Sequence, residues 1–334
     1  MRDVLRLVHP KPRDDKESEM FKKIVKGELE SPETWEVIIS KEGSKKETWE
    51  KAVKVMPIMA LLRNLRNLLE NKVSEEAIQY TIAQLRDEKT ILNSKQFPFR
   101  FLSAYRAIQN TEGGSRVLSA LDYAMSISIR NLPILDGATA VFGDNSGSMT
   151  GKVSGKSEIQ LMDVGSMLGG IASIISPDNI TGVFADDFKI VNFSVRESAL
   201  ARAEKMKQTN VGGSTMAYKA FKYLVDNGIK VHRIFLFSDM QCYNEDRNIE
   251  GESVYGYWEK YKQRVNPGAY LYSFDLAGYG TSQVPEDDPR VLLVAGWTEN
   301  ILRYIPYFER DRKTVLQEIR QIEPDSFKKI EQST

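Results

Sequence analysis

The chain has 334 residues, of which 41% are hydrophobic and 28% charged, so it is long enough for two domains and has the composition of a folded protein. It contains no run of about 18 apolar residues, no apolar secretion signal at its start and only one cysteine, Cys242, so we expect a reduced, cytoplasmic protein without a membrane span. The formal net charge is zero, but residues 1–135 carry a balance of +4 and the remainder −4, which favours an anionic partner for the first part.

The first 135 residues form a succession of predicted helices with short connections. Cap residues, prolines and apolar spacing predict helices that begin at Asp15, at Ser31-Pro32, at Ser44 with a capping box, after Pro57, at Ser74 and at Pro98, with a last one over residues 116–130. Because no strand pattern interrupts them, we expect residues 1–135 to be an α-helical array of HEAT-like repeats.

From residue 136 the pattern changes to alternating strands and helices. Strands are predicted at residues 139–142, 180–184, 190–193, 233–237, 270–275 and 291–294, and helices at 158–175, 197–207, 217–225, 258–264 and 314–322. This order predicts a doubly wound, Rossmann-like domain over residues 136–334, with one antiparallel edge pair in a parallel sheet. Such sheets bind ligands at the carboxyl ends of their strands.

A cluster of oxygen-bearing side chains follows the first of these strands. Asp144, Ser146 and Ser148 occupy alternate positions in the stretch Asp144–Ser148, directly after the apolar run 138–142. One carboxylate and two hydroxyls are ligands that a hard divalent cation such as Mg2+ accepts, since it takes few protein oxygens and keeps several waters.

Two later stretches can complete this cluster at the same edge of the sheet. Thr215 follows a pair of glycines, and Asp239 ends a second apolar strand. Ser214 follows the same glycines and is the rival of Thr215. In this order the pieces resemble the metal-ion-dependent adhesion site of von Willebrand factor A domains, which implies one Mg2+ or Mn2+ ion held at Asp144, Ser146, Ser148, Thr215 and Asp239.

Two alternatives remain for this edge. The five residues could be turn and cap residues of a bare Rossmann-like edge. The run Thr150–Ser157 ends in Gly-Lys-Ser, like a nucleotide-binding P-loop, but it has threonine where the first glycine is expected and does not leave the strand directly. Asp186 and Asp187 form a predicted hairpin turn, and Asp275 ends a strand near the same edge.

Four residues of the helical part are candidates for contact with a partner. His9 and Lys11 lie in a proline-bounded loop, and Arg63 and Arg66 lie close together on one predicted helix. The structural interpretation of the arginines is a solvated helix face, because arginine is common there.

Taken together, the chain resembles the Ro autoantigen family of TROVE-domain RNA-binding proteins. The resemblance is carried by Asp3–Pro12, Met56–Leu65 and Phe97–Arg100, followed in family order by the Asp144, Gly212–Thr215 and Asp239 stretches. It implies a ring of HEAT repeats closed by a von Willebrand factor A domain, with no enzymatic activity of its own.

The resemblance also implies partners. Family members bind Y RNAs on the outer ring surface and thread the single-stranded 3′ ends of misfolded RNAs through the ring, and bacterial relatives work with a 3′ exoribonuclease. His9 matches a family position on the Y-RNA face, and Lys11, Arg63 and Arg66 are further carry-overs. The alternative function is a metal-dependent protein-interaction scaffold that binds no RNA.

One departure from the family concerns assembly. The family places further helical repeats before the stretch that matches Asp3–Pro12. We therefore expect a partial chain or domain, a chain whose remaining repeats come from a second polypeptide, or a shortened relative. The apolar residues Val4, Leu5, Leu7 and Val8 are therefore expected to be buried against another polypeptide or a second copy.

Overall fold

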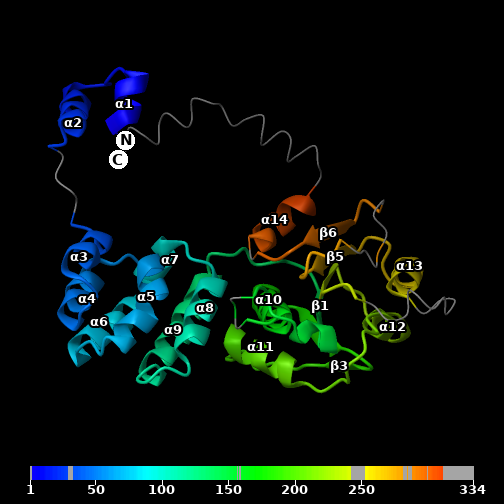
Figure 1. The fold of residues 1–334 in the computed structure, drawn as a ribbon. Coiled ribbons are helices and arrows are strands. Elements are labelled where there is room, and N and C mark those ends of the chain that lie inside the picture. The colour runs from blue at the N-terminus through cyan, green and yellow to red at the C-terminus, as the bar shows by residue number, and fades with distance from the viewer. Residues whose placement is uncertain are drawn as a thin grey trace. The chain divides into compact units, whose positions relative to one another are not determined.

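The computed structural model describes residues 2–28, 33–155, 157, 159–241, 253–280, 284, 288–298 and 300–310 (Figure 1). The chain divides into two compact units, Met1–Thr81 and Ile82–Thr334. The expected helix start at Ser31-Pro32, the P-loop lysine Lys156, Cys242 and the expected helix over 314–322 lie outside the described residues. None of the described helices is long and apolar enough to cross a membrane.

The first unit is helical, as the sequence predicts. Its elements are α1 (Arg2–Val8), α2 (Asp15–Lys26), α3 (Trp35–Glu42), α4 (Lys46–Ala52), a short 3-10 turn η1 (Val53–Val55), α5 (Ile58–Glu70) and α6 (Glu75–Arg86), which continues into the second unit. Pro57 divides the run as expected, since it directly precedes α5 in an extended conformation.

Three details of this unit differ from the sequence prediction. They are the caps of α4 and α3 and the presence of helix α1 at the start of the chain. Helix α4 has no side-chain cap, because the Ser44 hydroxyl accepts a hydrogen bond from the Trp49 indole at 2.8 Å instead of capping a backbone N–H. Helix α3 begins after Thr34, whose hydroxyl accepts from the Val37 N–H. The apolar run at the start of the chain forms α1, whose Leu7 is 82% exposed.

The second unit joins three helices to an α/β domain. Its helices are α7 (Glu88–Ser94), α8 (Pro98–Ile108), α9 (Ser115–Ile129), α10 (Leu161–Ile175), α11 (Ala199–Gln208), α12 (Tyr218–Asp226), α13 (Val254–Arg264) and α14 (Ile301–Phe308), with a short turn η2 (Gly147–Thr150). Its strands are β1 (Thr139–Asp144), β2 (Asn179–Phe184), β3 (Phe188–Ile190), β4 (Arg233–Ser238), β5 (Tyr270–Asp275) and β6 (Val291–Ala295).

The strands form one six-stranded sheet in the order β3-β2-β1-β4-β5-β6. All neighbours are parallel except β2 and β3, which confirms the predicted sheet with one antiparallel edge pair. Strand β1 lies between β2 and β4, with Asp144 opposite Phe184 and Gly143 opposite Phe237. The carboxyl ends of the central strands therefore meet at one edge of the sheet.

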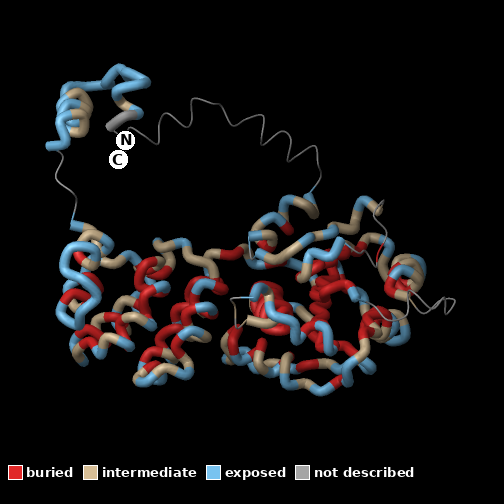
Figure 2. Tube along the Cα trace, in the orientation of Figure 1, coloured by how far each residue is buried: buried red, intermediate tan, exposed pale blue. Residues whose placement is uncertain are grey.

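Helices cover both faces of the sheet, and their contact residues alternate along each strand (Figures 1 and 2). Phe142 and Leu236 belong to the core under α12 and α13. Val141 and Phe237 face α10, which approaches closely at its glycines. Gly170 also permits the contact of α10 with α11, because a Cβ there would lie 2.8 Å from the Ala199 carbonyl oxygen.

Ion pairs join the helical layer of this unit to the α/β domain. Arg106 of α8 donates to Asp163 at 3.3 Å and also pairs with Glu204 of α11. Lys207 donates to the same Asp163 carboxylate at 2.7 Å. Asp163 accepts from the Gln160 N–H as well, so it begins α10 while it binds both cations.

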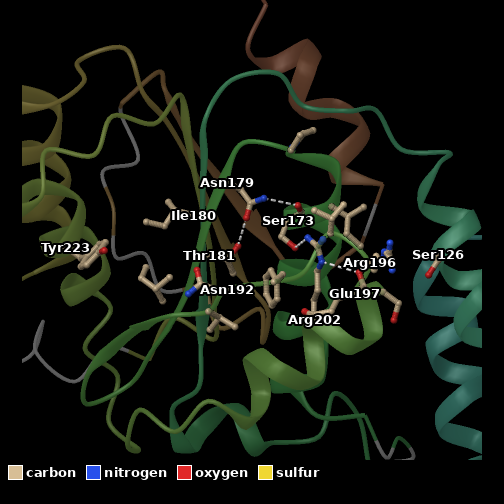
Figure 3. A pocket seen from close by; sticks show the side chains of 17 residues that line it. Ser126, Ser173, Asn179, Ile180, Thr181, Asn192, Arg196, Glu197, Arg202 and Tyr223 are labelled. Carbon is tan, nitrogen blue, oxygen red and sulfur yellow. Dashed lines mark hydrogen bonds between the residues drawn. The ribbon is translucent and has the colours of Figure 1, made fainter.

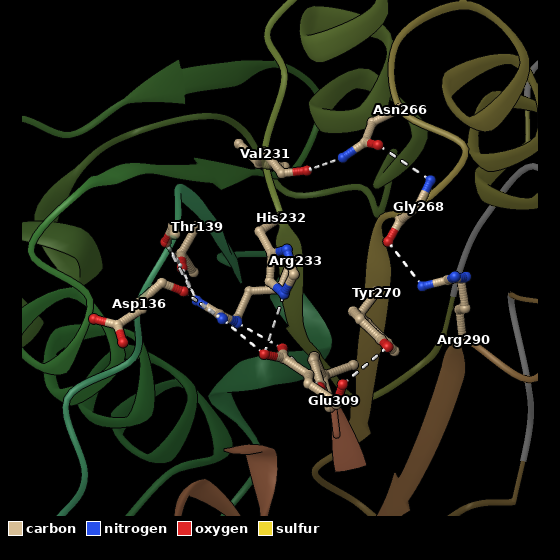
Figure 4. A network of polar contacts seen from close by, with 12 residues as sticks. Asp136, Thr139, Val231, His232, Arg233, Asn266, Gly268, Tyr270, Arg290 and Glu309 are labelled. Carbon is tan, nitrogen blue, oxygen red and sulfur yellow. Dashed lines mark hydrogen bonds and ion pairs between the residues drawn. The ribbon is translucent and has the colours of Figure 1, made fainter. Parts of the chain in front are cut away.

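A second buried network holds the segment after α14 to the sheet (Figure 4). Arg233, at the start of β4, donates from Nε and Nη2 to the two carboxylate oxygens of Glu309, both at 2.7 Å. The side chains are only 3% and 10% exposed. Tyr272 and His232 contact the same carboxylate, at 2.9 and 3.3 Å.

Replacing Glu309 by glutamine is expected to lower the free energy of unfolding of the α/β domain by about 3 kcal/mol, because the buried Arg233 guanidinium loses its paired charge. Urea unfolding followed by circular dichroism measures this change. Asp226→Asn is the control, since its ion pair with Lys222 is exposed and worth about 1 kcal/mol or less. Equal effects of the two variants would contradict the structural role of the Arg233–Glu309 pair.

Candidate functional site

The candidate site lies at the carboxyl ends of β1 and β4. The run that forms β1 is buried along its whole length, as expected for a central parallel strand, and it ends on Asp144. The neighbouring strand β4 is equally buried and is followed directly by Asp239. The sheet topology thus brings together two carboxylates that are 95 residues apart in the sequence.

Asp144 is the centre of the hydrogen bonds at this edge. One carboxylate oxygen accepts from the Ser146 N–H at 2.8 Å and the other from the Ser238 hydroxyl at 2.6 Å. The residue is 2% exposed, and burial raises the pKa of its carboxyl to about 6. The charge of Asp239 adds to this rise, while the bonds from Ser238 and Ser146 oppose it.

The two serines of the motif lie side by side. Their hydroxyl oxygens are 3.2 Å apart, with Ser146 buried and Ser148 exposed. The backbone folds this way because Asp144 fixes the Ser146 N–H and the Gly147 N–H donates to the Gly213 carbonyl at 2.9 Å. Three of the predicted residues therefore form one oxygen cluster.

Asp239 has an unsatisfied oxygen. It is 1% exposed, and its Oδ1 accepts from the Gln241 N–H at 3.2 Å. Its Oδ2 is buried and has no hydrogen-bond partner among the described residues. A buried carboxylate oxygen without a donor is costly, and a bound cation is one arrangement that removes the cost.

The loop that contains Thr215 is held by Asp186, which the sequence predicts only to be part of a hairpin turn. The Asp186 carboxylate accepts from the Gly213 N–H at 3.1 Å and the Ser214 N–H at 2.9 Å. Gly212 has φ +95°, and a Cβ there would overlap the Asp186 carboxylate. Bonds from Ser214 and Gly213 keep the pKa of the Asp186 carboxyl below its usual value. Asp186 therefore fixes the glycine turn against the β2–β3 hairpin.

This arrangement distinguishes Ser214 from Thr215, the two candidate hydroxyl ligands in that loop. The Ser214 side chain also hydrogen-bonds to Asp186, whereas Thr215 is buried, with 6% of it exposed. Asn145 is a further residue of this edge that the sequence pattern does not single out. It is buried, and its amide donates to the carbonyls of Met206 and Thr209 at 2.8 and 3.1 Å. It fastens the loop after β1 to the end of α11.

Asp275 has a local role. Its two oxygens accept from the N–H groups of Gly278 and Gly280, each at 2.8 Å, so it caps the loop that follows β5. Within the described part of the chain, no three His, Cys, Asp or Glu side chains gather into a metal group. The edge has two carboxylates, and its other oxygens come from hydroxyls.

The four candidate RNA-binding residues lie in the first unit. His9 and Lys11 are exposed just after α1, and His9 has φ +44°. Arg63 and Arg66 are exposed on α5, where Arg66 forms a 3.3 Å ion pair with Glu70. On the described residues, no hydrogen bond or ion pair links His9 or Lys11 to the two arginines.

The neighbouring asparagines of α5 have a structural role instead. The amide of the buried Asn64 donates to the Ala60 carbonyl, and Asn67 donates to Asn64, both at 2.9 Å. They form a side-chain ladder along the helix, while Arg63 and Arg66 project from it to solvent.

The fold and this edge define a class of protein: helical repeats followed by an α/β domain of the von Willebrand factor A type. Residues 23–125 match the TROVE domain. The chain is therefore similar to the Ro/TROVE family over this helical part.

Individual proteins are also similar to parts of this chain or share its fold. The chain is similar to telomerase protein component 1 of Mus musculus and Rattus norvegicus, with 41% and 39% identity over 90 residues. These matches cover 26% of this chain and 3% of each relative, so the chain spans a small part of their length. The crystal structure of the Deinococcus radiodurans Ro (RSR) protein has the same fold, with a TM-score of 0.67, 20% identity, and coverage of 92% of this chain and 70% of that one.

Asp186→Ala is expected to raise the amide hydrogen-exchange rates of Gly213 and Ser214 by roughly tenfold, because their N–H groups lose a charged acceptor. Exchange measured by mass spectrometry or NMR tests this. Asp187→Ala is the matched control, because among the described residues the Asp187 side chain accepts only from the Phe188 N–H. Unchanged exchange rates in Asp186→Ala would show that the glycine turn keeps its conformation without the Asp186 carboxylate.

Proposed function

We propose that the chain is a noncoding-RNA-binding protein whose sheet edge holds one divalent cation, Mg2+ or Mn2+, and through it an acidic group of a partner. The RNA part of the proposal is supported by the match of residues 23–125 to the TROVE domain, whose family binds RNA. The observation that carries the cation part is the buried, unpartnered Oδ2 of Asp239 beside the buried Asp144.

The donor set suits such an ion. Ser146, Ser148 and Thr215 supply neutral oxygens, and Asp144 and Asp239 supply charge by one carboxylate oxygen or through water. Because few charged groups contact it, the ion keeps enough positive charge to accept an external carboxylate or phosphate. The bond from Ser214 to Asp186 supports Thr215 as the hydroxyl that faces the ion.

For the helical part, we propose that His9, Lys11, Arg63 and Arg66 contact RNA phosphates. All four are exposed, and the ion pair of Arg66 is a surface pair that a phosphate can replace at little cost. Y RNAs and the single-stranded 3′ ends of misfolded RNAs are the proposed ligands, with an exoribonuclease as the proposed acidic partner. The chain then acts by binding, in the cytoplasm, and not by catalysis.

Assembly with further helical repeats or a second copy is part of the same proposal. Val4, Leu7 and Val8 of α1 are 59%, 82% and 66% exposed, and α2 has no buried residue. An apolar surface of this kind favours contact with another polypeptide.

A metal-dependent scaffold that binds no RNA is the second candidate function. It is favoured by the location of all five edge residues in the unit Ile82–Thr334, outside the unit that carries the candidate RNA residues. Filter binding of the chain to Y RNA and to single-stranded RNA distinguishes the two candidates, since a scaffold would bind neither above the level of an unrelated acidic protein.

Asp144→Ala is expected to abolish Mg2+ and Mn2+ binding while the fold survives, because the residue lies at the edge of the sheet and its loss removes a charge that faces the ion. Titration calorimetry measures the affinity, and circular dichroism checks the fold. Asp187→Asn removes an exposed charge of the nearby hairpin and should leave the affinity unchanged. An Asp144→Ala protein that binds the ions as the parent does would refute the assignment.

Replacing Arg63 and Arg66 together by glutamine is expected to reduce the slope of log affinity against log salt by about 1.4 for single-stranded RNA, which corresponds to two phosphate contacts. Single strands are the right test, since side chains read them more readily than an RNA duplex. The control replaces the exposed Lys230 and Arg264 of the α/β domain by glutamine and changes the net charge equally. Identical slopes of log affinity against log salt in both double variants would show that the arginines do not contact RNA and have a structural role.

A further inference from the structure

A cavity of about 920 Å³ lies at the opposite end of the sheet from the candidate metal site (Figure 3). It is formed by the start of β2, the end of α10, the segment after β3 and the start of α11, with Ser126 of α9 and Tyr223 of α12 on its two sides. Asn179 begins β2 here, whereas Phe184 at its other end pairs with Asp144. The volume is in the range of small-molecule sites.

The cavity has a buried arginine in its wall. Arg202 is 8% exposed, and its guanidinium donates to the Ser173 hydroxyl at 2.9 Å and to the carbonyls of Ser194 and Glu197, each at 3.3 Å. All three acceptors are neutral. A guanidinium has five N–H donors, so two have no acceptor within the part of the chain that the structure describes.

This cation also forms no ion pair with any described residue. Burial lowers the pKa of the Arg202 guanidinium, and only the more distant charge of Glu197 opposes this. A buried charge without a bound counter-charge is unfavourable, and an anion brought by a ligand would offset the cost with charge-assisted hydrogen bonds. The Phe193 ring, 5.1 Å from the guanidinium carbon, supports the group from one side.

Two further charged residues line the cavity. Arg196 is exposed and adds a second cation. Glu197 accepts from Lys205 at 3.3 Å through Oε1, while its Oε2 is buried and has no partner among the described residues. An anion alone would satisfy the arginines and leave the Oε2 of Glu197 without a donor. The ligand must therefore carry both a negative group and hydrogen-bond donors.

The rest of the lining limits the ligand further. Ile174, Ile180 and Val191 supply an apolar wall, which a heterocyclic ring would cover and a sugar phosphate would not. Burial raises the pKa of the Asp122 carboxyl, which lies near Ser198 at the start of α11. An anion, donors and a flat apolar part occur together in a nucleotide.

We propose that this cavity binds a nucleoside monophosphate, with its phosphate at Arg202 and Arg196 and its ribose hydroxyls or base amine at Glu197. The apolar wall contacts the base. The same chemical group occurs in a free nucleotide and at the 5′-phosphorylated end of an RNA. This site is separate from the candidate metal site and does not depend on it.

Titration calorimetry of the whole chain with AMP and UMP tests the proposal. Saturable binding is expected, with affinity at least tenfold lower for adenosine and for inorganic phosphate, because each of these satisfies only part of the site. Arg202→Gln should lower the AMP affinity at least tenfold. Arg264→Gln, an exposed arginine of α13 outside the cavity, should leave it unchanged.

Circular dichroism checks that each variant is folded. If Arg202→Gln unfolds the chain, the exposed Arg196→Gln decides the test, with an expected severalfold loss. No saturable binding of either nucleotide, equal binding of inorganic phosphate, or unchanged affinity in both cavity variants would overturn the proposal. A 5′-phosphorylated trinucleotide that binds more tightly than AMP assigns the site to RNA ends, and one that binds more weakly assigns it to free nucleotides.

Discussion

The buried carboxylate of Asp144 is the interaction on which the edge of the sheet depends. It accepts hydrogen bonds from the Ser238 hydroxyl of the neighbouring strand and from the Ser146 N–H of the loop that follows it. These bonds hold the ends of β1 and β4 together. Asp239 is buried beside it with an oxygen that no described residue satisfies. Two buried carboxylates with few donors are unfavourable unless a proton or a cation joins them. The raised pKa of Asp144 and the proposed cation are two consequences of this one constraint.

Two further sets of contacts stabilise the strands and loops around Asp144. Asp186 fastens the glycine turn, and the Gly213 carbonyl in turn accepts from Gly147 in the loop after β1. At the other end of β4, the buried Arg233–Glu309 pair binds the segment after α14 to the sheet (Figure 4). Arg202 is the opposite case, a buried cation for which no described residue supplies a paired anion. Among the described residues, Asp239 and Arg202 thus place unsatisfied buried charges at opposite ends of the sheet.

The sequence predicts the class of fold because its signals are local. Apolar runs give the strands, Pro57 and Pro98 give helix starts, and the alternation of elements predicts the parallel sheet with one antiparallel edge pair. The five edge residues could be proposed from the Asp-x-Ser-x-Ser spacing and the strand ends. The role of Asp186 could not, because a carboxylate in a hairpin and the N–H groups it binds are 27 and 28 residues apart. The buried state of Arg202, the Arg233–Glu309 pair and the loss of the Ser44 cap to Trp49 also arise from tertiary contacts that carry no local pattern.

The location of the bound ion is the most direct test of the account. Crystals of the chain grown with Mn2+ would be measured for anomalous scattering near the manganese absorption edge. One strong peak is expected within coordination distance of Ser146, Ser148 and Thr215, next to the Asp239 oxygen that no described residue satisfies. No peak at this edge in crystals that hold manganese elsewhere would contradict it.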